Sequence, residues 1–156
     1  MAPRVTSVCL LAVVLCGCLS EVPKSAPAKQ AEAPPPADET RYLPKAGFVD
    51  SEVLRKELLG QPFAPGGTVG HYKRGPREYD LFLVRGTTPT QVAIMLLDWK
   101  KAMQEPKFIP SFGAYYGTIG QRPYFVFTKG EWIAGIAGLN EKEADAPARD
   151  FAARLN

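Results

Sequence analysis

Residues 124–138 have the sequence YFVFTKGEWIAGIAG, in which Lys129-Gly130 separates two apolar runs. Short apolar runs of this kind predict two antiparallel strands, over 124–128 and 131–138, with a tight two-residue loop at Lys129-Gly130. The first run is apolar on both faces, so we expect a central strand that is covered on both sides. The second run contains small residues, against which a helix backbone could pack closely. We call these two strands and their loop the central hairpin, and we expect it to form part of an antiparallel sheet.

Before this hairpin the sequence predicts another strand, over 112–118, and before that the clearest helix of the chain. Thr88 can cap this helix, Pro89 suits its first position, and Gln91 completes a capping box. Pro106 stops its continuation. Apolar residues recur at helical spacing along two lines, which predicts a deeply buried helix; they are Val92, Ile94, Met95, Leu96, Leu97, Trp99 and Met103.

Further toward the N-terminus, two strands over 68–73 and 78–85 are expected to pair around a turn at Gly75-Pro76. A short helix is expected from Asp50 or Ser51 to Gly60, because its apolar residues follow helical spacing. Those residues are Val53, Leu54, Leu58 and Leu59.

After the central hairpin, Asn140 and Glu143 form a second capping box, which predicts a final helix. Pro147 conflicts with an unbroken helix, so we expect either a kink there or a start at Asp145. The order of elements predicts one α+β domain over residues 42–156. It has an antiparallel sheet of about five strands, with two to three helices mainly on one face.

The first eighteen residues have the pattern of an export signal. Arg4 precedes an apolar run from Val8 to Leu15, which is too short to span a membrane and suits a secretory signal. The run closes on Leu15-Cys16-Gly17-Cys18. Ordinary signal cleavage nearby, or an uncleaved signal anchor, would also fit this pattern.

The Leu-x-Gly-Cys ending resembles the lipobox of bacterial lipoproteins, although Cys16 stands where that family more often has Ala, Ser or Thr. The resemblance implies a signal peptide over residues 1–17, cleavage between Gly17 and Cys18, and acyl chains such as palmitate on Cys18. The protein would then be held by lipid on a membrane of the cell envelope, facing the periplasm. In lipoproteins of enteric bacteria Asp after the cysteine retains the protein at the inner membrane, so Leu19 favours the outer membrane.

Residues 18–41 predict a lipidated cysteine followed by a disordered tether. The segment is rich in Pro and Ala and poor in large apolar residues, so it cannot offset the entropy of ordering. Its prolines favour an extended backbone, which would hold the folded domain away from the bilayer.

Cysteine content and charge exclude several classes of function. All three cysteines lie at positions 9, 16 and 18, so the body cannot form a disulfide, a catalytic thiol or a Cys-ligated metal site. Loss of Arg4 with the signal leaves 18 basic and 16 acidic residues, a net charge of +2, which argues against nucleic-acid binding. The local cluster of Lys73, Arg74 and Arg77 is expected to be a solvated turn.

The body contains no recognisable catalytic motif, cofactor motif or metal-binding motif. His71 is the only histidine, and neither Ser51 nor Ser111 lies in a nucleophile elbow. Carboxylate chemistry is the one catalytic class left open, and Asp80 with Asp98 is the pair to test.

A cluster of aromatic residues is expected to be core, with a ligand-binding lip as the alternative: Phe108, Phe112, Tyr115, Tyr116 and Tyr124. Segments 66–72, 79–83 and 148–155 (GGTVGHY, YDLFL and ARDFAARL) are similar to bacterial lipoproteins grouped as a domain of unknown function. That resemblance implies no activity. We therefore expect a non-enzymatic envelope module that binds a protein or a cell-wall glycan, without cofactor. A carboxylate-dependent hydrolase acting on cell-wall glycans and a carrier of a small apolar ligand are the alternatives.

Overall fold

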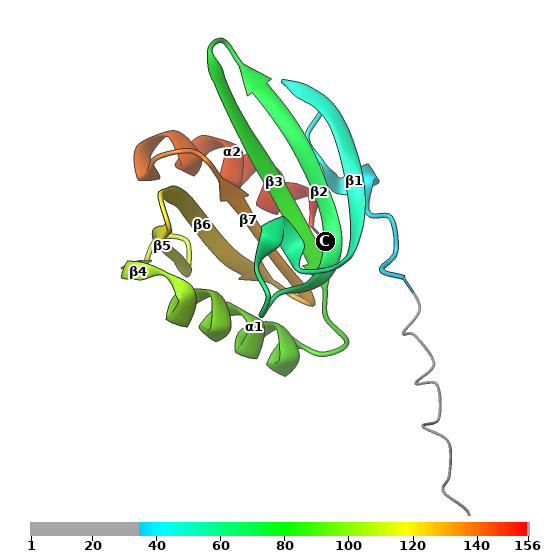
Figure 1. Cartoon of the computed structure of the whole chain (residues 1–156), viewed down its shortest axis with the longest axis vertical. Helices are drawn as coiled ribbons and strands as arrows, with labels where there is room; N and C mark the ends of the chain where they lie inside the picture. The colour runs from blue at the N-terminus through cyan, green and yellow to red at the C-terminus, as the bar shows by residue number, and fades with distance from the viewer. Residues whose placement is uncertain (1–34, 156) are drawn as a thin grey trace, which may run out of the picture. The chain divides into compact units, whose positions relative to one another are not determined.

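The central hairpin lies in the middle of a seven-stranded antiparallel sheet (Figure 1). The structure is a computed structural model that describes residues 35–155. The hairpin consists of β6 (Arg122–Lys129) and β7 (Trp132–Ala137), and the strand order is β1-β2-β3-β7-β6-β5-β4. Lys129 pairs with Trp132, so the loop residues are Gly130 and Glu131, one position later than predicted. The α+β class is confirmed, with seven strands instead of about five.

The remaining elements complete one small domain. They are η1 (Thr40–Tyr42), β1 (Phe48–Lys56), η2 (Leu58–Gly60), β2 (Pro65–Arg74), β3 (Arg77–Arg85), α1 (Pro89–Ala102), β4 (Gln104–Ile109), β5 (Ala114–Ile119) and α2 (Glu141–Arg154). No helix in this described range is long and apolar enough to cross a membrane.

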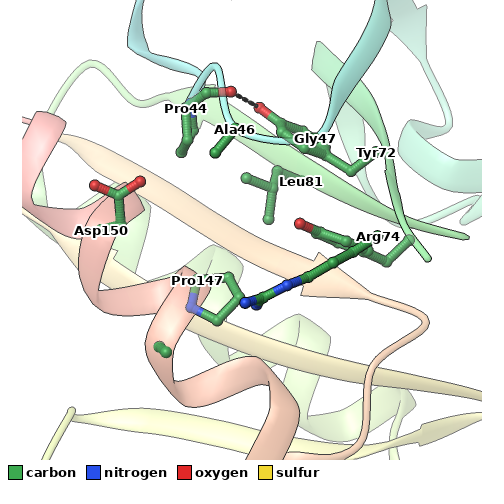
Figure 2. A pocket seen from close by; sticks show the side chains of 10 residues that line it. Pro44, Ala46, Gly47, Tyr72, Arg74, Leu81, Pro147 and Asp150 are labelled. Carbon is green, nitrogen blue, oxygen red and sulfur yellow. Dashed lines mark hydrogen bonds between the residues drawn. The ribbon is translucent and has the colours of Figure 1, made fainter. Parts of the chain in front are cut away.

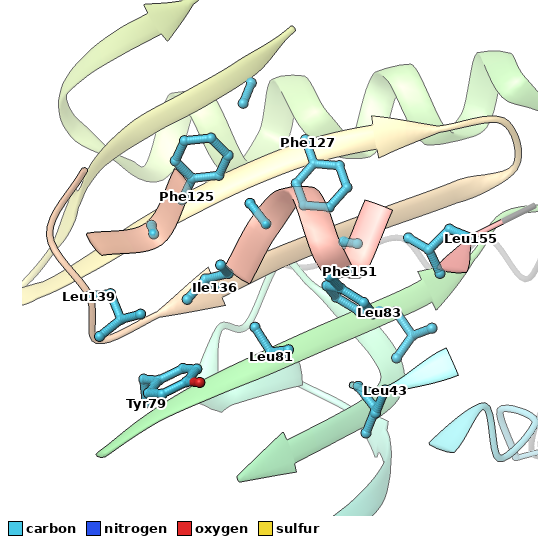
Figure 3. Close-up of a cluster of buried hydrophobic side chains, with 14 of the residues drawn as sticks. Leu43, Tyr79, Leu81, Leu83, Phe125, Phe127, Ile136, Leu139, Phe151 and Leu155 are labelled. Atoms are coloured by element: carbon cyan, nitrogen blue, oxygen red, sulfur yellow. The ribbon is translucent and has the colours of Figure 1, made fainter. Parts of the chain in front are cut away.

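The two α-helices cover opposite faces of the sheet, so the expectation that they gather on one face is wrong. Trp99 of α1 packs in one core, with Phe82 and Val126 among its members. Phe151 of α2 packs in the other, shown in Figure 3, with Leu81 and Phe127 among its members. Because β3 and β6 carry apolar side chains on both faces, each face needs its own helix. We call these the α1-side core and the α2-side core.

The predicted caps of both helices are present. The Thr88 hydroxyl accepts from the backbone N–H of Gln91 at 3.2 Å, and the Asn140 side chain accepts from that of Glu143 at 3.0 Å. However, α1 is not deeply buried, since Ile94 and Leu97 are 55% and 46% exposed. The sheet covers only one side of this helix, and Ile94 and Leu97 lie on the other side.

The segment predicted as a helix from Asp50 to Gly60 is mainly a strand. β1 pairs along β2, and only the turn η2 follows it. Glu57 and Leu59 have φ of +55° and +52°, which a continuous α-helix does not allow. The helical spacing of Val53, Leu54, Leu58 and Leu59 is therefore shared between a strand and a turn.

The second unpredicted strand is β4, at the opposite edge of the sheet. It contains Pro106, which lies within a strand four residues after the end of α1 at Ala102. Proline is tolerated in edge strands because its missing N–H is not needed on the open side.

α2 runs without a break from Glu141 to Arg154, with Pro147 inside it. The predicted start at Asp145 is therefore wrong. Proline has no N–H, so it cannot donate to the carbonyl of Glu143 one turn earlier.

The chain joins the domain before Tyr42. The N–H of Glu39 donates to the Thr68 hydroxyl at 3.0 Å, and the hydroxyls of Thr40 and Ser51 lie 3.0 Å apart. Leu43 is buried in the α2-side core. Residues 39–43 therefore belong to the folded domain. The predicted signal peptide, Gly17, Cys18 and most of the tether lie outside the described residues.

Candidate functional site: a groove beside helix α2

A groove lies between residues 44–47, the end of the β2–β3 hairpin and α2 (Figure 2). It has a volume of about 320 Å³. Its lining includes Tyr72, Arg74, Tyr79, Leu81 and Pro147. A second hollow shares Arg74, Tyr79 and Pro147 with it and continues past them along α2. We refer to the two hollows together as the groove.

Two stacked tyrosines form much of its floor. The rings of Tyr72 and Tyr79 are 5.3 Å apart and 20° from parallel. The Tyr72 hydroxyl donates to the carbonyl of Pro44 at 2.7 Å, which ties the 44–47 segment to the sheet (Figure 2). Within residues 35–155 the Tyr79 hydroxyl makes no hydrogen bond. Burial raises the pKa of both tyrosines, so both hydroxyls remain protonated at neutral pH.

Arg74 is the one member of the predicted basic cluster that has no ion-pair partner in the described part of the chain. Lys73 lies 3.1 Å from Glu78, and Arg77 lies 2.6 Å from Glu143. All three cations lie at the β2–β3 turn, as expected. Arg74 extends from β2 toward Pro147 on the far wall (Figure 2). A guanidinium there is available to an anionic ligand.

The opposite wall, α2, offers acceptors. The Glu143 carbonyl receives no helical hydrogen bond from Pro147, because proline lacks the donor. Asp150 lines the groove one turn further on and lies 3.6 Å from Arg154. The groove therefore has donors on the hairpin side, acceptors on the helix side and an apolar floor. That arrangement suits a segment of extended polypeptide.

A separate polar network surrounds His71 on the other face of the sheet. His71 Nδ1 lies 2.7 Å from Asp80 Oδ1, and Arg122 donates to the other Asp80 oxygen at 2.5 Å. His71 Nε2 lies 3.5 Å from Glu52. These groups satisfy one another, and the network joins β1, β2, β3 and β6.

The electrostatic setting of His71 follows from this geometry. Partial burial alone would lower its pKa, but the hydrogen bond to Asp80 and the charges of Asp80, Asp50 and Glu52 outweigh that effect. The net result is a pKa raised above the ordinary value of 6.5.

The proposed carboxylate pair is not joined by any contact in the described chain. Asp80 lies between His71 and Arg122, while Asp98 lies on α1, 3.5 Å from Lys101. The hydrolase stays a hypothesis. Residues 35–155 hold no group of three or more His, Cys, Asp or Glu side chains placed to bind a metal.

The aromatic cluster is divided between the two cores. Tyr124 is buried beside Trp99, and Phe112 packs on Phe125 and Phe127. Tyr115 and Tyr116 lie on opposite faces, both half-buried. Phe108 is 50% exposed, with its ring 5.3 Å from that of Tyr115.

The comparisons with known proteins found no matching family model, no matching curated protein and no matching solved structure. The lipobox and body resemblances therefore stay predictions.

Proposed function

We propose that this protein is a lipid-anchored module of the bacterial envelope that captures an extended, acidic segment of another envelope protein. Cys18 carries the lipid, the Pro/Ala-rich segment is the spacer, and the groove beside α2 is the binding site. The observation that supports the binding role is Arg74, a cation that has no ion-pair partner among residues 35–155 and lies beside stacked tyrosines. No enzymatic step is part of this proposal.

The groove supports this class of ligand through its polar groups. An extended segment exposes carbonyls and N–H groups alternately along its length. The Tyr79 hydroxyl can donate to a carbonyl, and the Glu143 carbonyl can accept from an N–H. Arg74 adds the strongest contact, because a charged hydrogen bond contributes about 1.5–3 kcal/mol. An acidic side chain of the ligand is therefore expected at Arg74.

Site-specific photo-crosslinking in living cells tests the groove. A photoreactive residue in place of Ala146, which is exposed and lines the groove, should crosslink to one envelope protein. The same residue in place of Ala93, exposed on α1, is the matched control and should not. Arg74→Glu should reduce the Ala146 crosslink about tenfold or more, because attraction becomes repulsion.

The control for charge alone is Lys129→Glu, at the far hairpin. If Arg74→Glu and Lys129→Glu give equal yields of the crosslink from position 146, Arg74 does not contact the ligand and the proposal fails. A crosslink to cell-wall glycan, and none to protein, would show that the groove binds the glycan and that the proposed protein ligand is wrong.

The anchor has its own test, which exploits the neighbouring thiols at positions 16 and 18. Cells fed an alkyne-labelled fatty acid should label the wild-type protein and Cys16→Ala equally, because Cys16 leaves with the signal. Cys18→Ala should lose the label and keep the mass of the unprocessed chain. A label that persists in Cys18→Ala would rule out this anchor.

A further inference from the structure

One edge of the sheet is open along a whole strand. β1 pairs with β2 on one side, and no described strand pairs with its other side. Seven of its nine residues are exposed, including Val49 and Val53 at 61% and 37%. Residues 39–43 contact the sheet through the Thr68 and Ser51 hydroxyls and through the α2-side core. An open edge offers unpaired N–H and C=O groups to another strand.

The other edge of the same sheet is protected. β4 carries Pro106, which cannot donate, and Glu105, whose φ is +49°. The β4–β5 register also shifts between Gln104 and Lys107. Bulges and proline are the usual devices that prevent pairing at an edge. β1 has one bulge at its first residues and none from Asp50 to Lys56, so the two edges differ in what they permit.

The charges along β1 indicate which strand fits this edge. Asp50 and Glu52 lie in its first half and Lys56 at its end, and the β2 register places all three on one face. A second β1, antiparallel and related by a two-fold axis through Val53, brings Asp50 of each copy opposite Lys56 of the other. Opposite charges on facing residues stabilise a sheet. Glu52 then faces Leu54, and the two exposed Val53 side chains meet on the axis.

We propose that two copies of this chain associate through β1, which extends each sheet into a continuous sheet of fourteen strands, twice the seven of one copy. Neither Asp50 nor Lys56 forms an ion pair within residues 35–155, although the charge of Asp50 acts on His71, which lies opposite it on β2. The groove beside α2 is not part of this interface.

Disulfide formation in the purified full chain tests the register. Directly opposed residues of antiparallel strands have Cα atoms about 4.5–5.5 Å apart, within the roughly 4.4–6.8 Å range of a disulfide. Val53→Cys should therefore give a covalent dimer under mild oxidation. Val49→Cys is the matched control: it is more exposed, but its two copies would lie about 27 Å apart. The wild-type chain controls for the cysteines at positions 9, 16 and 18.

A charge exchange provides an independent readout. Lys56→Asp places like charges opposite each other twice, so the dissociation constant measured by sedimentation should rise about tenfold. Asp50→Lys should act similarly, and the double variant Asp50→Lys/Lys56→Asp should restore most of the affinity. Thermal unfolding of each variant checks that the monomer is intact.

Three results would overturn the proposal. The first is a full chain that stays monomeric at all concentrations. This result would overturn the proposal even if another part of the chain or another protein were found to cover β1. The second is equal crosslinking of Val53→Cys and Val49→Cys. The third is a double charge variant that associates no better than the single ones.

Discussion

His71 is held by carboxylates from both neighbouring strands, and this decides how the protein responds to pH. Its pKa in the folded protein is raised, mainly through Asp80, despite the opposing effect of burial. A raised pKa means that the protonated form stabilises the fold. That stabilisation is complete below a pH of about 6.5 and is lost as the pH rises through the folded-state pKa. The free energy of unfolding should therefore fall over that interval.

The carboxylate at position 80 controls this behaviour. Asp80→Asn should lower the pKa of His71 and flatten the pH dependence, and Glu52→Gln should lower it less, because Glu52 lies at 3.5 Å. NMR titration measures both, and the single histidine makes its assignment unambiguous. A pKa of His71 that is unchanged in Asp80→Asn would show that the ion pair is not formed in solution.

At the scale of elements, β7 fits its neighbours through a glycine. A Cβ added at Gly135 would lie 2.5 Å from Cζ of Phe82 and 2.7 Å from the Phe125 carbonyl oxygen. Both contacts are far too short, so the Phe82 ring or the strand must move. The sequence indicated small residues in β7 for a close approach of a helix backbone. At Gly135 the group that approaches is an aromatic ring.

Gly135→Ala should therefore lower the free energy of unfolding by about 1–3 kcal/mol, the usual cost of overpacking a core. Urea denaturation measures this change. Combining it with Phe82→Leu should cost less than the sum of the two single variants, because the smaller side chain makes room. Strictly additive losses would contradict the clash.

Local signals in the sequence predicted the elements whose structure is set locally. Thr88 and Asn140 cap their helices as expected, and the hairpin around Gly130 is misplaced by one residue only. The sequence does not predict the two edge strands, because each of them depends on pairing with a single neighbouring strand and carries no clear local strand pattern. β1 carries apolar residues at helical spacing, and β4 contains a proline.

The groove could not be predicted from local patterns. Its residues come from three segments far apart in the chain, namely 44–47, the β2–β3 hairpin and α2. In the sequence Arg74 is one of three neighbouring cations at a predicted turn, and nothing distinguishes it from the other two. The one local feature that points to the groove is Pro147 within a capped helix. It predicts an irregular helix, but it does not predict which residues lie opposite that helix.

At the scale of the whole molecule, one sheet connects two cores. Phe82 and Val126 belong to the α1-side core, while Leu81, Leu83 and Phe127 of the same strands belong to the α2-side core. Loss of either helix exposes the strands that the other helix needs. The two cores should therefore unfold together.

The two tryptophans test this cooperativity, because each lies in a different core. Trp99 is buried in the α1-side core, and Trp132 is buried in the α2-side core. Trp132→Phe and Trp99→Phe each leave one fluorescent reporter. Within each variant, the fluorescence and far-UV circular dichroism transitions should share one midpoint. Separate midpoints would show that one core survives without the other.

The place where the chain joins the sheet has a mechanical consequence. Pro35 and Ala37 lie beside Pro65–Gly67 at the start of β2, whereas the groove lies at its other end, ten residues and about 30 Å away. Tension between a tether and a ligand held by the β2–β3 side of the groove would run along β2. The ladder hydrogen bonds to β1 and β3 lie perpendicular to that direction, so they would be sheared together instead of unzipped one at a time. A strand loaded in this way resists extraction far better than one pulled from its edge.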